Sequence, residues 1–523
     1  MIRTALVIHG HFYQPTRENP WTGLVEREAS ARPFHDWNAR ILAECYRPNA
    51  FAEVIDDGGR VLRHVNNYAL VSFNFGPTLA SWIERADPEV YRRILEGDRE
   101  SLRLRGGHGN AIAQGYHHTI LPLANARDLR TEIRWGKTDF RLRFRREPEA
   151  MWLPETACND DVLCALIEEG LKYVILSPRQ AARVRAPGAY EWQDVTGGRV
   201  DATRPYKFSH RDGSGRAIAV FFYDGRVANA VAFEGVLVSS ARLVSLFERA
   251  AGDGRPALVS TATDGESYGH HFRYGERCLA YALEEVAPAR GFEVTNYGEV
   301  LARRPAEWEV EIDAGPDGEG TSWSCAHGVG RWRRDCGCHA GRDESWNQAW
   351  RAPLRAALDF LRDDAAEKFD TTARALLRDP WAARDAYAEL ISDRSLSARA
   401  EFLGRHAART LSGEEARRAL RLLEMQREAL AMYTSCGWFF DDISGLEASQ
   451  VLRHAGRALE LLDESGLDAP RARFLSMLSE ARSNVPSQGD GADIFRRVVE
   501  ASRRAAGRVD ERFADERLLE ELI

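Results

Sequence analysis

The chain lacks a long apolar run, an excess of positive charge and a dense set of cysteines. No stretch of its 523 residues approaches the ~20 apolar residues that a membrane-spanning helix needs. Lys and Arg number 71 against 79 Asp and Glu, a net charge of −8, which argues against nucleic acid or an anionic membrane as partner. The eight cysteines are scattered, and the N-terminus MIRTALVIHGHF has no cleavage site typical of a signal peptide. We therefore expect a cytoplasmic protein with reduced thiols.

The composition is that of a large globular protein. Hydrophobic residues make up 44% and charged residues 29% of the chain, which is too apolar for a disordered protein. At roughly 100–200 residues per domain, this length predicts two to four structural units. Tryptophan is abundant, with 13 copies, several beside Gly, His or Asp. These side chains can pack cores and interfaces, or offer flat apolar platforms to the faces of sugars.

Short apolar runs alternate with longer amphipathic stretches over the first three hundred residues. A helix is predicted over 161–170, with Asp161 as its cap and Gly170 as its end. Strands that alternate with helices indicate a parallel sheet, and this many units favour a barrel. The predicted strands are Thr4–Ile8, Ala69–Phe75, Ala150–Leu153, Tyr173–Leu176, Ile218–Tyr223 and Ala257–Thr261.

Changes in composition divide the chain into three parts. Residues 1–304 are predicted to form the barrel, and 305–345 a connecting segment rich in Gly, Trp and Cys. Residues 346–523 are predicted to form an α-helical domain, in which Ser412 and Glu415 have the spacing of a capping box. The overall expectation is an α/β barrel followed by a helical C-terminal domain.

Ionisable residues follow three of the predicted strands. His9 and His11 follow the first, Glu155 follows the strand that contains Trp152, and Asp264 follows the last. Barrel enzymes build their active sites at the C-terminal ends of strands, where the loops converge. The pattern therefore predicts one active site formed by these side chains.

Taken singly, the motifs at these positions are weak. An H-x-H pair is typical of metal ligands in amidohydrolase barrels, but two hydrogen-bonded structural histidines have the same pattern. A W-L-P-E sequence alone more often holds an ion pair or a helix cap than a catalyst. Burial would raise the pKa of Glu155 unless hydrogen-bond donors offset it.

Five motifs in order give a stronger signal. HGHFYQP, H-x-x-L-P-L beginning at His118, W-L-P-E, D-x-E-x-x-G-H and the aromatic motif after Ser435 resemble the motif regions of glycoside hydrolase family 57. The resemblance spans roughly residues 9–445. It implies an incomplete (β/α)7 barrel and a helical domain that closes the cleft. It also implies a retaining enzyme acting on α-1,4-glucans, of the amylase, 4-α-glucanotransferase or glycogen branching enzyme type.

The resemblance also implies roles for individual residues. Glu155 matches the nucleophile and Asp264 the general acid/base, and the fourth motif is closest to its branching-enzyme version. No metal and no cofactor is implied, and the partner is an α-glucan polysaccharide or maltooligosaccharide. The residues expected to bind substrate are His9, His11, His118, Trp152, Glu266, His270 and Trp438.

The chemistry of a retaining glycosidase fits these residue types. It needs two carboxyl groups ~5–5.5 Å apart, one that attacks the anomeric carbon and one that protonates the leaving oxygen. The two groups have opposite pKa requirements, because the nucleophile must be ionised and the acid protonated. Departures in the motifs, such as Phe12-Tyr13 in the first and Cys436-Gly437 in the fifth, leave the product type open.

Two other functions remain alternatives. A metal-dependent polysaccharide deacetylase or amidohydrolase would use His9, His11, His118 and Asp264 as ligands. A non-catalytic α-glucan-binding protein would keep the barrel without turnover, although the presence of both carboxylates counts against it. The sequence does not predict an oligomeric state.

A cysteine cluster in the connecting segment is a separate feature. Cys325, Cys336 and Cys338 lie near His327 and His339, but the spacings C-x-H and C-x-C-H do not match a common zinc finger. The pattern favours reduced thiols that are packed or lie beside the substrate. Structural zinc and a redox disulfide are the alternatives.

Overall fold

The computed structural model describes residues 4–56, 58–252, 258–341, 343 and 345–521. These residues form two compact units. Unit 1 comprises residues 1–14, 27–116 and 140–324, and unit 2 comprises 15–26, 117–139 and 325–523. The predicted boundary at residue 304 does not coincide with this division, because strand β14 (Trp308–Ile312) pairs inside unit 1.

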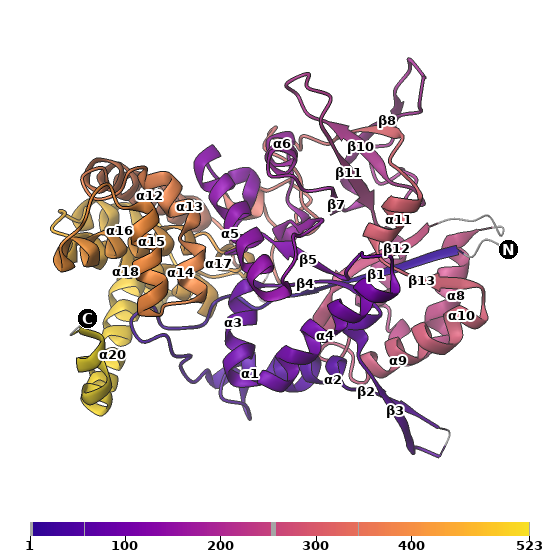
Figure 1. Ribbon diagram of the computed structural model, residues 1–523, viewed down its shortest axis with the longest axis horizontal. Coiled ribbons are helices and arrows are strands. Elements are labelled where there is room, and N and C mark those ends of the chain that lie inside the picture. The colour runs from indigo at the N-terminus through magenta and orange to yellow at the C-terminus, as the bar shows by residue number, and fades with distance from the viewer. Residues whose placement is uncertain (1–3, 57, 253–257, 342, 344, 522–523) are drawn as a thin grey trace. The chain divides into compact units, whose positions relative to one another are not determined.

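In the described residues of unit 1, seven parallel strands form an incomplete barrel, and Figure 1 labels these strands. Five are hydrogen-bonded in the order β12-β1-β4-β5-β6, a bridge between Ala150 and Tyr173 leads to β7, and β7 pairs in parallel with β11. In the described part of the chain no ladder joins β11 to β12, so the ring stays open there. The strands are β12 (Leu258–Asp264), β1 (Thr4–Phe12), β4 (Ser72–Phe75), β5 (Ala111–Gln114), β6 (Met151–Trp152), β7 (Tyr173–Leu176) and β11 (Ala217–Phe222).

Most of the predicted strands are confirmed, with shifted ends. The first runs on to Phe12, the strand predicted from Ala69 begins at Ser72, and the last extends to Asp264, while its predicted first residue, 257, lies outside the described residues. The helix predicted over 161–170 is present as α6 (Asp160–Glu168). Its cap is Asn159 and not Asp161, because the Asn159 side chain accepts a hydrogen bond from the backbone N–H of Val162 at 3.0 Å.

The alternation of side chains along β1 separates the two faces of the sheet. Leu6 and Ile8 pack with residues of the helices outside the barrel, whereas Val7 packs with residues of the interior, including Trp152. Because successive side chains of a strand point to opposite faces, His9 and His11 lie on the same face as Val7. Both histidines are buried, with 0% and 5% of their surface exposed.

Short helices and further strands complete unit 1. Strand β13 (Phe292–Val294) pairs with β1, β2 (Ala52–Ile55) and β3 (Val61–Val65) form a separate hairpin, and β10 (Tyr206–Ser209), β14, β8 (Ala181–Arg185) and β9 (Gln193–Asp194) extend the sheet beyond β11. The helices are α1 (Trp37–Ile41), α2 (Arg47–Ala50), α3 (Pro77–Ala86), α4 (Pro88–Leu104), α6, α7 (Gly225–Phe233), α8 (Ser240–Ala251), α9 (Gly275–Tyr281), α10 (Ala287–Ala289) and α11 (Tyr297–Arg303).

Unit 2 is helical, as predicted for the C-terminal region. Helix α18 packs against α16 and α20, and α12 packs against α16 and α19. The predicted capping box at the start of α16 is present: the Ser412 side chain accepts from the Glu415 N–H, and Glu415 accepts from the Ser412 N–H. The helices are α5 (Ala126–Phe144, in unit 2 as far as Asp139), α12 (Arg351–Ala373), α13 (Pro380–Ala386), α14 (Ala388–Ser392), α15 (Leu396–His406), α16 (Gly413–Ala431), α17 (Cys436–Phe439), α18 (Leu446–Glu464), α19 (Arg471–Leu478) and α20 (Gly491–Glu521).

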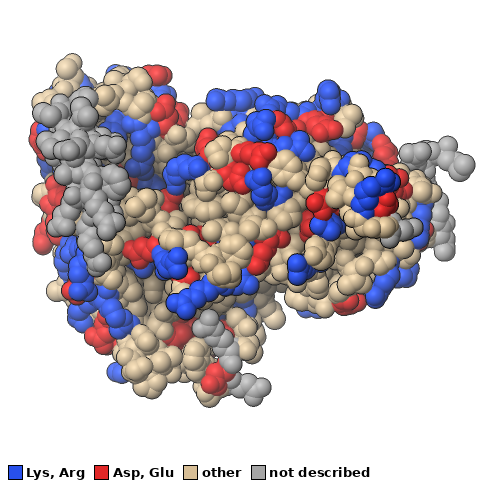
Figure 2. Space-filling model, turned by 90° about the horizontal axis from the view of Figure 1, so that it is seen from below, with Lys and Arg blue, Asp and Glu red and all other residues tan. Residues whose placement is uncertain are grey.

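Charged residues of both signs are interspersed on one face of the protein. Figure 2 shows Lys and Arg alternating with Asp and Glu over the face in view. Many charged residues of the protein form exposed ion pairs, such as Arg183 with Glu311 and Arg63 with Glu284. None of the helices in the described residues combines the length and the apolar character that crossing a membrane requires.

Candidate active site

Glu155 lies at a strained point of the backbone directly after β6. Pro154–Thr156 form a 3-10 turn, in which Glu155 has φ 58° and Thr156 has φ 50°. Left-handed φ values are uncommon for residues other than glycine and cost of order 1–3 kcal/mol each. Strain of this kind is concentrated at active sites, where it directs a side chain. The half-buried Glu155 is therefore held in an orientation that an ordinary turn would not give it.

Two side chains donate hydrogen bonds to the Glu155 carboxylate. The indole N–H of Trp323 lies 3.0 Å from Oε2, and the hydroxyl of Ser324 lies 2.5 Å from the same oxygen. The backbone N–H of Trp323 also donates to the Glu155 carbonyl at 3.0 Å. Hydrogen bonds of this kind favour the ionised form of a carboxyl group.

Asp264 ends β12 in register with His11 of the neighbouring strand β1. Its side chain is accessible to solvent, yet the surrounding protein removes most of the water that would hydrate it. Desolvation, together with the negative charges of Glu266 and Glu155, raises the pKa of Asp264 to about 8. At neutral pH Asp264 therefore carries a proton, whereas Glu155 is held by donors that suit an anion.

Glu266 is a third carboxyl group beside this pair. It is buried, and burial raises its pKa to about 7 although hydrogen bonds from Tyr46 and Gln14 oppose the shift. The Tyr46 hydroxyl donates to Glu266 Oε1 at 2.6 Å, and the Gln14 amide lies 3.5 Å from the same oxygen.

His9 and His11 are neutral at physiological pH. Burial lowers the pKa of His9 to about 3 and that of His11 to about 4. The Asn74 side chain lies 3.1 Å from a ring nitrogen of each, and the other nitrogen of His9 lies 3.0 Å from the Ser72 hydroxyl. A neutral imidazole can still donate one hydrogen bond and accept another.

The rings of His9 and His11 both stack on the Trp152 ring. Its ring centroid lies 4.7 Å from that of His9 and 5.2 Å from that of His11, and Trp323 packs edge-on at 5.2 Å. Both histidines, Trp152 and Trp323 therefore form one aromatic cluster beside Glu155. His9 and Trp152 are fully buried in this cluster, and the half-buried Trp323 is the ring that can contact the apolar face of a sugar.

His270 sits at the end of the fourth motif and bonds to Glu44. Its Nδ1 lies 2.5 Å from Glu44 Oε2. The preceding Gly269 has φ 139°, and a Cβ there would lie 2.3 Å from the Glu44 carbonyl oxygen. Only glycine permits this close approach, so the G-H part of the motif brings His270 to Glu44.

His118 and Trp438 belong to unit 2. His118 Nδ1 lies 2.6 Å from the Ser435 hydroxyl, and the Ser435 N–H donates to the His118 carbonyl at 2.9 Å. Trp438 is 1% exposed, stacks on Tyr433 and donates to the Arg351 carbonyl at 3.3 Å. The second and fifth motifs thus pack together although 317 residues separate His118 from Ser435.

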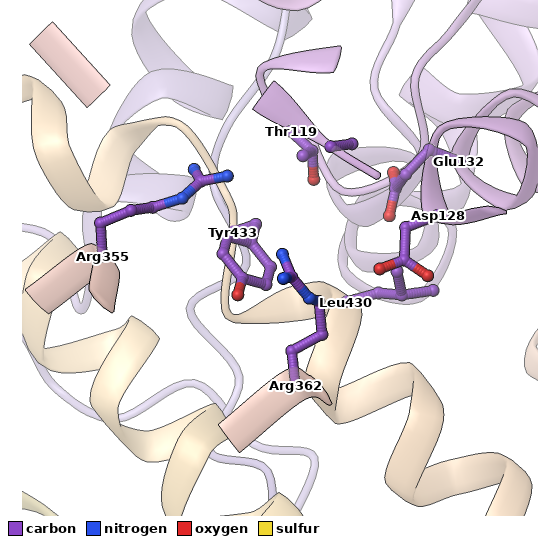
Figure 3. Close-up of a pocket in the computed structure, with 8 residues that line it drawn as sticks. Thr119, Asp128, Glu132, Arg355, Arg362, Leu430 and Tyr433 are labelled. Carbon is purple, nitrogen blue, oxygen red and sulfur yellow. The ribbon is translucent and has the colours of Figure 1, made fainter. Parts of the chain in front are cut away.

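A small pocket in unit 2 lies beside these motifs (Figure 3). Figure 3 shows the Tyr433 ring between Arg355 and Arg362, with Asp128 and Glu132 opposite. These charged groups have partners: both arginines pair with Asp359, Asp128 pairs with Arg384, and Glu132 pairs with His117. The pocket is therefore lined by ion pairs that fix the helices. Its lining is Thr119, Ala124, Asp128, Glu132, Arg355, Arg362, Leu430 and Tyr433.

Among the described residues of unit 1, no third metal-ligating side chain converges with the histidine pair. Within the described residues, the group of three or more His, Cys, Asp or Glu side chains with converging ligand atoms is Cys325, His327, Cys336 and Cys338. The ring nitrogens of His9 and His11 instead face Asn74 and Ser72. The alternative of a metal-dependent hydrolase gains no support from this geometry.

Sequence reasoning missed several side chains that position the site. A buried Asn74 inside the apolar strand SFNF is a usable signal, because a polar residue there needs partners. Tyr46, which donates to Glu266, and Ser324, which donates to Glu155, carry no comparable signal. Both reach their partners from segments more than 150 residues away in the chain.

Two family models match separate parts of the chain. The family model "Glycosyl hydrolase family 57" matches residues 11–312, and the model "Domain of unknown function (DUF3536)" matches residues 346–522. A search of curated protein sequences found no match.

Solved structures show the same fold at low identity. The exo-type maltose-forming amylase from Pyrococcus sp. ST04 is 15% identical with a TM-score of 0.68, and the match covers 98% of this chain and 94% of that one. The family 57 branching enzyme from Thermococcus kodakaraensis is 15% identical with a TM-score of 0.55, covering 96% and 94%. The 4-α-glucanotransferase from Thermococcus litoralis is 15% identical with a TM-score of 0.51, covering 89% and 60%. Because the family model spans more than half of the 523 residues, the chain belongs to glycoside hydrolase family 57.

Proposed function

We propose that the protein is a retaining enzyme that hydrolyses or transfers α-1,4-linked glucan chains through a glycosyl-enzyme intermediate. The observation that supports this proposal most directly is the contrast between the environments of two carboxyl groups. Glu155 accepts two hydrogen bonds from Trp323 and Ser324, whereas Asp264 has a pKa of about 8. Two carboxyls with opposed environments are what an ionised nucleophile and a protonated acid require. The amylase, branching enzyme and glucanotransferase among the similar structures support an α-glucan substrate.

In the proposed first step, Asp264 gives its proton to the glycosidic oxygen while Glu155 attacks the anomeric carbon. The C–O bond to the leaving sugar breaks, and a bond between the anomeric carbon and a Glu155 oxygen forms. In the second step Asp264, now ionised, removes a proton from water or from a sugar hydroxyl. The oxygen of that acceptor attacks the anomeric carbon, and the bond from this carbon to Glu155 breaks. Water as acceptor gives hydrolysis, and a sugar hydroxyl gives transfer.

The neutral histidines have a binding role in this proposal. Burial keeps both histidines unprotonated, so His11, which is 5% exposed, can hydrogen-bond a sugar hydroxyl without adding a positive charge. His9 is 0% exposed and faces Ser72 and Asn74. Trp323, which is half-buried, supplies apolar surface beside His11, while Trp152 and His9 stay predicted substrate-binding residues. His118, Glu266, His270 and Trp438 remain predicted substrate-binding residues.

Product analysis tests the proposal directly. The protein is incubated with amylose and with maltooligosaccharides, and reducing ends, chain-length redistribution and α-1,6 branches are measured separately. New reducing ends indicate hydrolysis, redistribution indicates 4-α-glucan transfer, and α-1,6 linkages indicate branching. An unchanged glucan that is nevertheless bound would contradict the proposal and favour a binding protein.

The pH profile should depend on Glu266. Its negative charge helps to raise the pKa of Asp264, so Glu266→Gln should lower that pKa. Because the acid must be protonated, the alkaline limb of kcat/KM should move to lower pH. The measurement is kcat/KM from pH 5 to about 10.

Glu276→Gln is the matched control for this shift. Glu276 is also buried with a raised pKa, but it is not among the charges that act on Asp264. The alkaline limb of kcat/KM for Glu276→Gln should lie at the same pH as that of the wild type. An unmoved or upward-moved limb in Glu266→Gln would contradict the assignment of Asp264 as the acid.

The two donors to Glu155 should matter for turnover. Trp323→Phe keeps the aromatic ring but removes the N–H that Glu155 accepts. A hydrogen bond to a charged group contributes about 1.5–3 kcal/mol, which corresponds to roughly 10–100-fold in kcat/KM. Ser324→Ala should have an effect in the same direction, and Trp192→Phe, at the β8–β9 hairpin, should have little. Activity of Trp323→Phe close to wild type would show that this bond does not position Glu155.

A further inference from the structure

Four ligand-type side chains of unit 2 converge on one point. Cys325, His327, Cys336 and Cys338 each place one donor atom within 4.8 Å of all the others. The sulfurs of Cys325 and Cys336 are 3.9 Å apart, and those of Cys325 and Cys338 are 3.8 Å apart. The Cys338 sulfur lies 3.5 Å from Nδ1 of His327.

These separations match the edges of a tetrahedral zinc site. With Zn–S near 2.3 Å and Zn–N near 2.0–2.1 Å, tetrahedral angles give about 3.8 Å between sulfurs and about 3.5 Å from sulfur to nitrogen. Three edges of the cluster are therefore already at the distances expected with zinc bound. All the other separations lie within 4.8 Å, so none exceeds the ideal edge by more than about 1 Å, which rotation of one side chain can close.

The distances do not suit the alternatives. A disulfide needs two sulfurs at about 2.0 Å, and Cys325, Cys336 and Cys338 are all free thiols. Reduced thiols that only fill a core would be enclosed by apolar side chains, but His327 is exposed and Cys338 is half-buried. Cys325 and Cys336 are buried and the other two side chains are partly or fully exposed. Together the three sulfurs and the imidazole nitrogen form a Cys3His donor set, which is typical of structural zinc.

The segment that contains the cluster has little regular structure to hold it in place. Between β14, which ends at Ile312, and α12, which begins at Arg351, the described residues contain one 3-10 turn, Gly330–Trp332. Loops of this length without regular structure are uncommon in compact folds unless something fixes them. A metal that joins residues 325 and 338 would fix this loop.

The charge around the cluster is also compensated. Three thiolates and one Zn²⁺ carry a net charge of −1, and the buried guanidinium of Arg351 interacts electrostatically with Cys336 and Cys338. Arg351 also donates to the Cys338 carbonyl at 2.9 Å. Helix α12 therefore supplies both a hydrogen bond and the balancing charge.

We propose that Cys325, His327, Cys336 and Cys338 bind one Zn²⁺ as a structural site that anchors the 325–338 loop to the start of α12. The indole N–H of Trp332, in the same loop, donates to the Ser435 carbonyl at 3.1 Å. By fixing this loop, the metal also holds the backbone of the fifth motif within unit 2. Cys325 follows Ser324 directly in the chain, which places the anchor next to a donor to Glu155.

Metal analysis of the full-length protein is the test. The protein is purified under reducing conditions, incubated with Zn²⁺ and separated from free metal. We expect close to one zinc per chain, and a lower Tm after removal of the metal with a chelator. Co²⁺ added to the metal-free protein should give intense visible bands of a tetrahedral thiolate site. Cys336→Ser and Cys338→Ser should lose the bound zinc, whereas Cys164→Ser, a half-buried cysteine of α6, should keep it.

The metal content of the wild-type chain decides the outcome even if a variant fails to fold. A folded wild-type chain without zinc after loading would overturn the proposal, as would iron as the bound metal. A disulfide among the three cysteines in the loaded protein would also overturn it. Retention of one zinc by Cys336→Ser and Cys338→Ser alike would assign the metal to another place.

Discussion

Asp264→Asn should reduce turnover of natural glucans by about 10²–10⁴-fold, the range that general acid catalysis contributes. A sugar oxygen leaves poorly without a proton, and an amide cannot supply one. The pKa of about 8 for Asp264 means that this proton is present at neutral pH in the wild-type enzyme. The measurement is kcat/KM on amylose at pH 7.

The fold should survive this substitution. Asn keeps the size of Asp and removes a carboxyl group that the site desolvates. Asp212→Asn, in the exposed 210–216 loop, is the control for the change of side chain alone. More than about a tenth of wild-type activity in Asp264→Asn would refute the role, because even the low end of the expected range exceeds tenfold.

Glu155→Gln should lose activity on every substrate, by roughly 10⁴-fold or more. Without a nucleophile no glycosyl-enzyme forms, so an activated leaving group should not restore turnover. Asp264→Asn should differ, because an activated group departs with little help from an acid. The measurement compares both variants on amylose and on an α-glucoside with an activated leaving group.

A glycine variant extends this comparison. Glu155 has φ 58°, which glycine adopts readily, so Glu155→Gly removes the carboxylate without adding backbone strain. Azide can then enter the vacated face and give a β-glycosyl azide, whereas Asp264→Asn should give the α-product from the intermediate. Glu191→Gln, exposed in unit 1, controls for the loss of a carboxylate. Restoration of Glu155→Gln by the activated substrate alone would contradict its role.

The barrel strands could be predicted, and the carboxyl pair could be proposed, because both depend on local sequence. β7 occupies its predicted residues, and the β-branched and aromatic residues of β1 and β11 set where those strands lie. Glu155 and Asp264 could be singled out because each lies at or just beyond the C-terminal end of a buried strand. The order of the five motifs gave the resemblance to glycoside hydrolase family 57, which no single motif was specific enough to give.

The remaining features depend on contacts between distant segments. Ser324 reaches Glu155 across 169 positions and Tyr46 reaches Glu266 across 220, and no local pattern encodes such pairs. The convergence of the cysteine cluster could not be predicted for the same reason: its spacing matches no common zinc finger, and its donor atoms come together only in the folded loop. The extension of the sheet by β10, β14, β8 and β9 was also missed, since these short strands lack a clear period.

The central claim is that Glu155 becomes covalently bound to the sugar. Asp264→Asn is exposed briefly to an α-glucoside with an activated leaving group, because the first step then proceeds while the second is slow. Peptides of the quenched protein are analysed by mass spectrometry. The account predicts one sugar residue on the peptide that contains Trp152–Thr156, attached at Glu155. A sugar on any other carboxylate, Glu266 included, would contradict it.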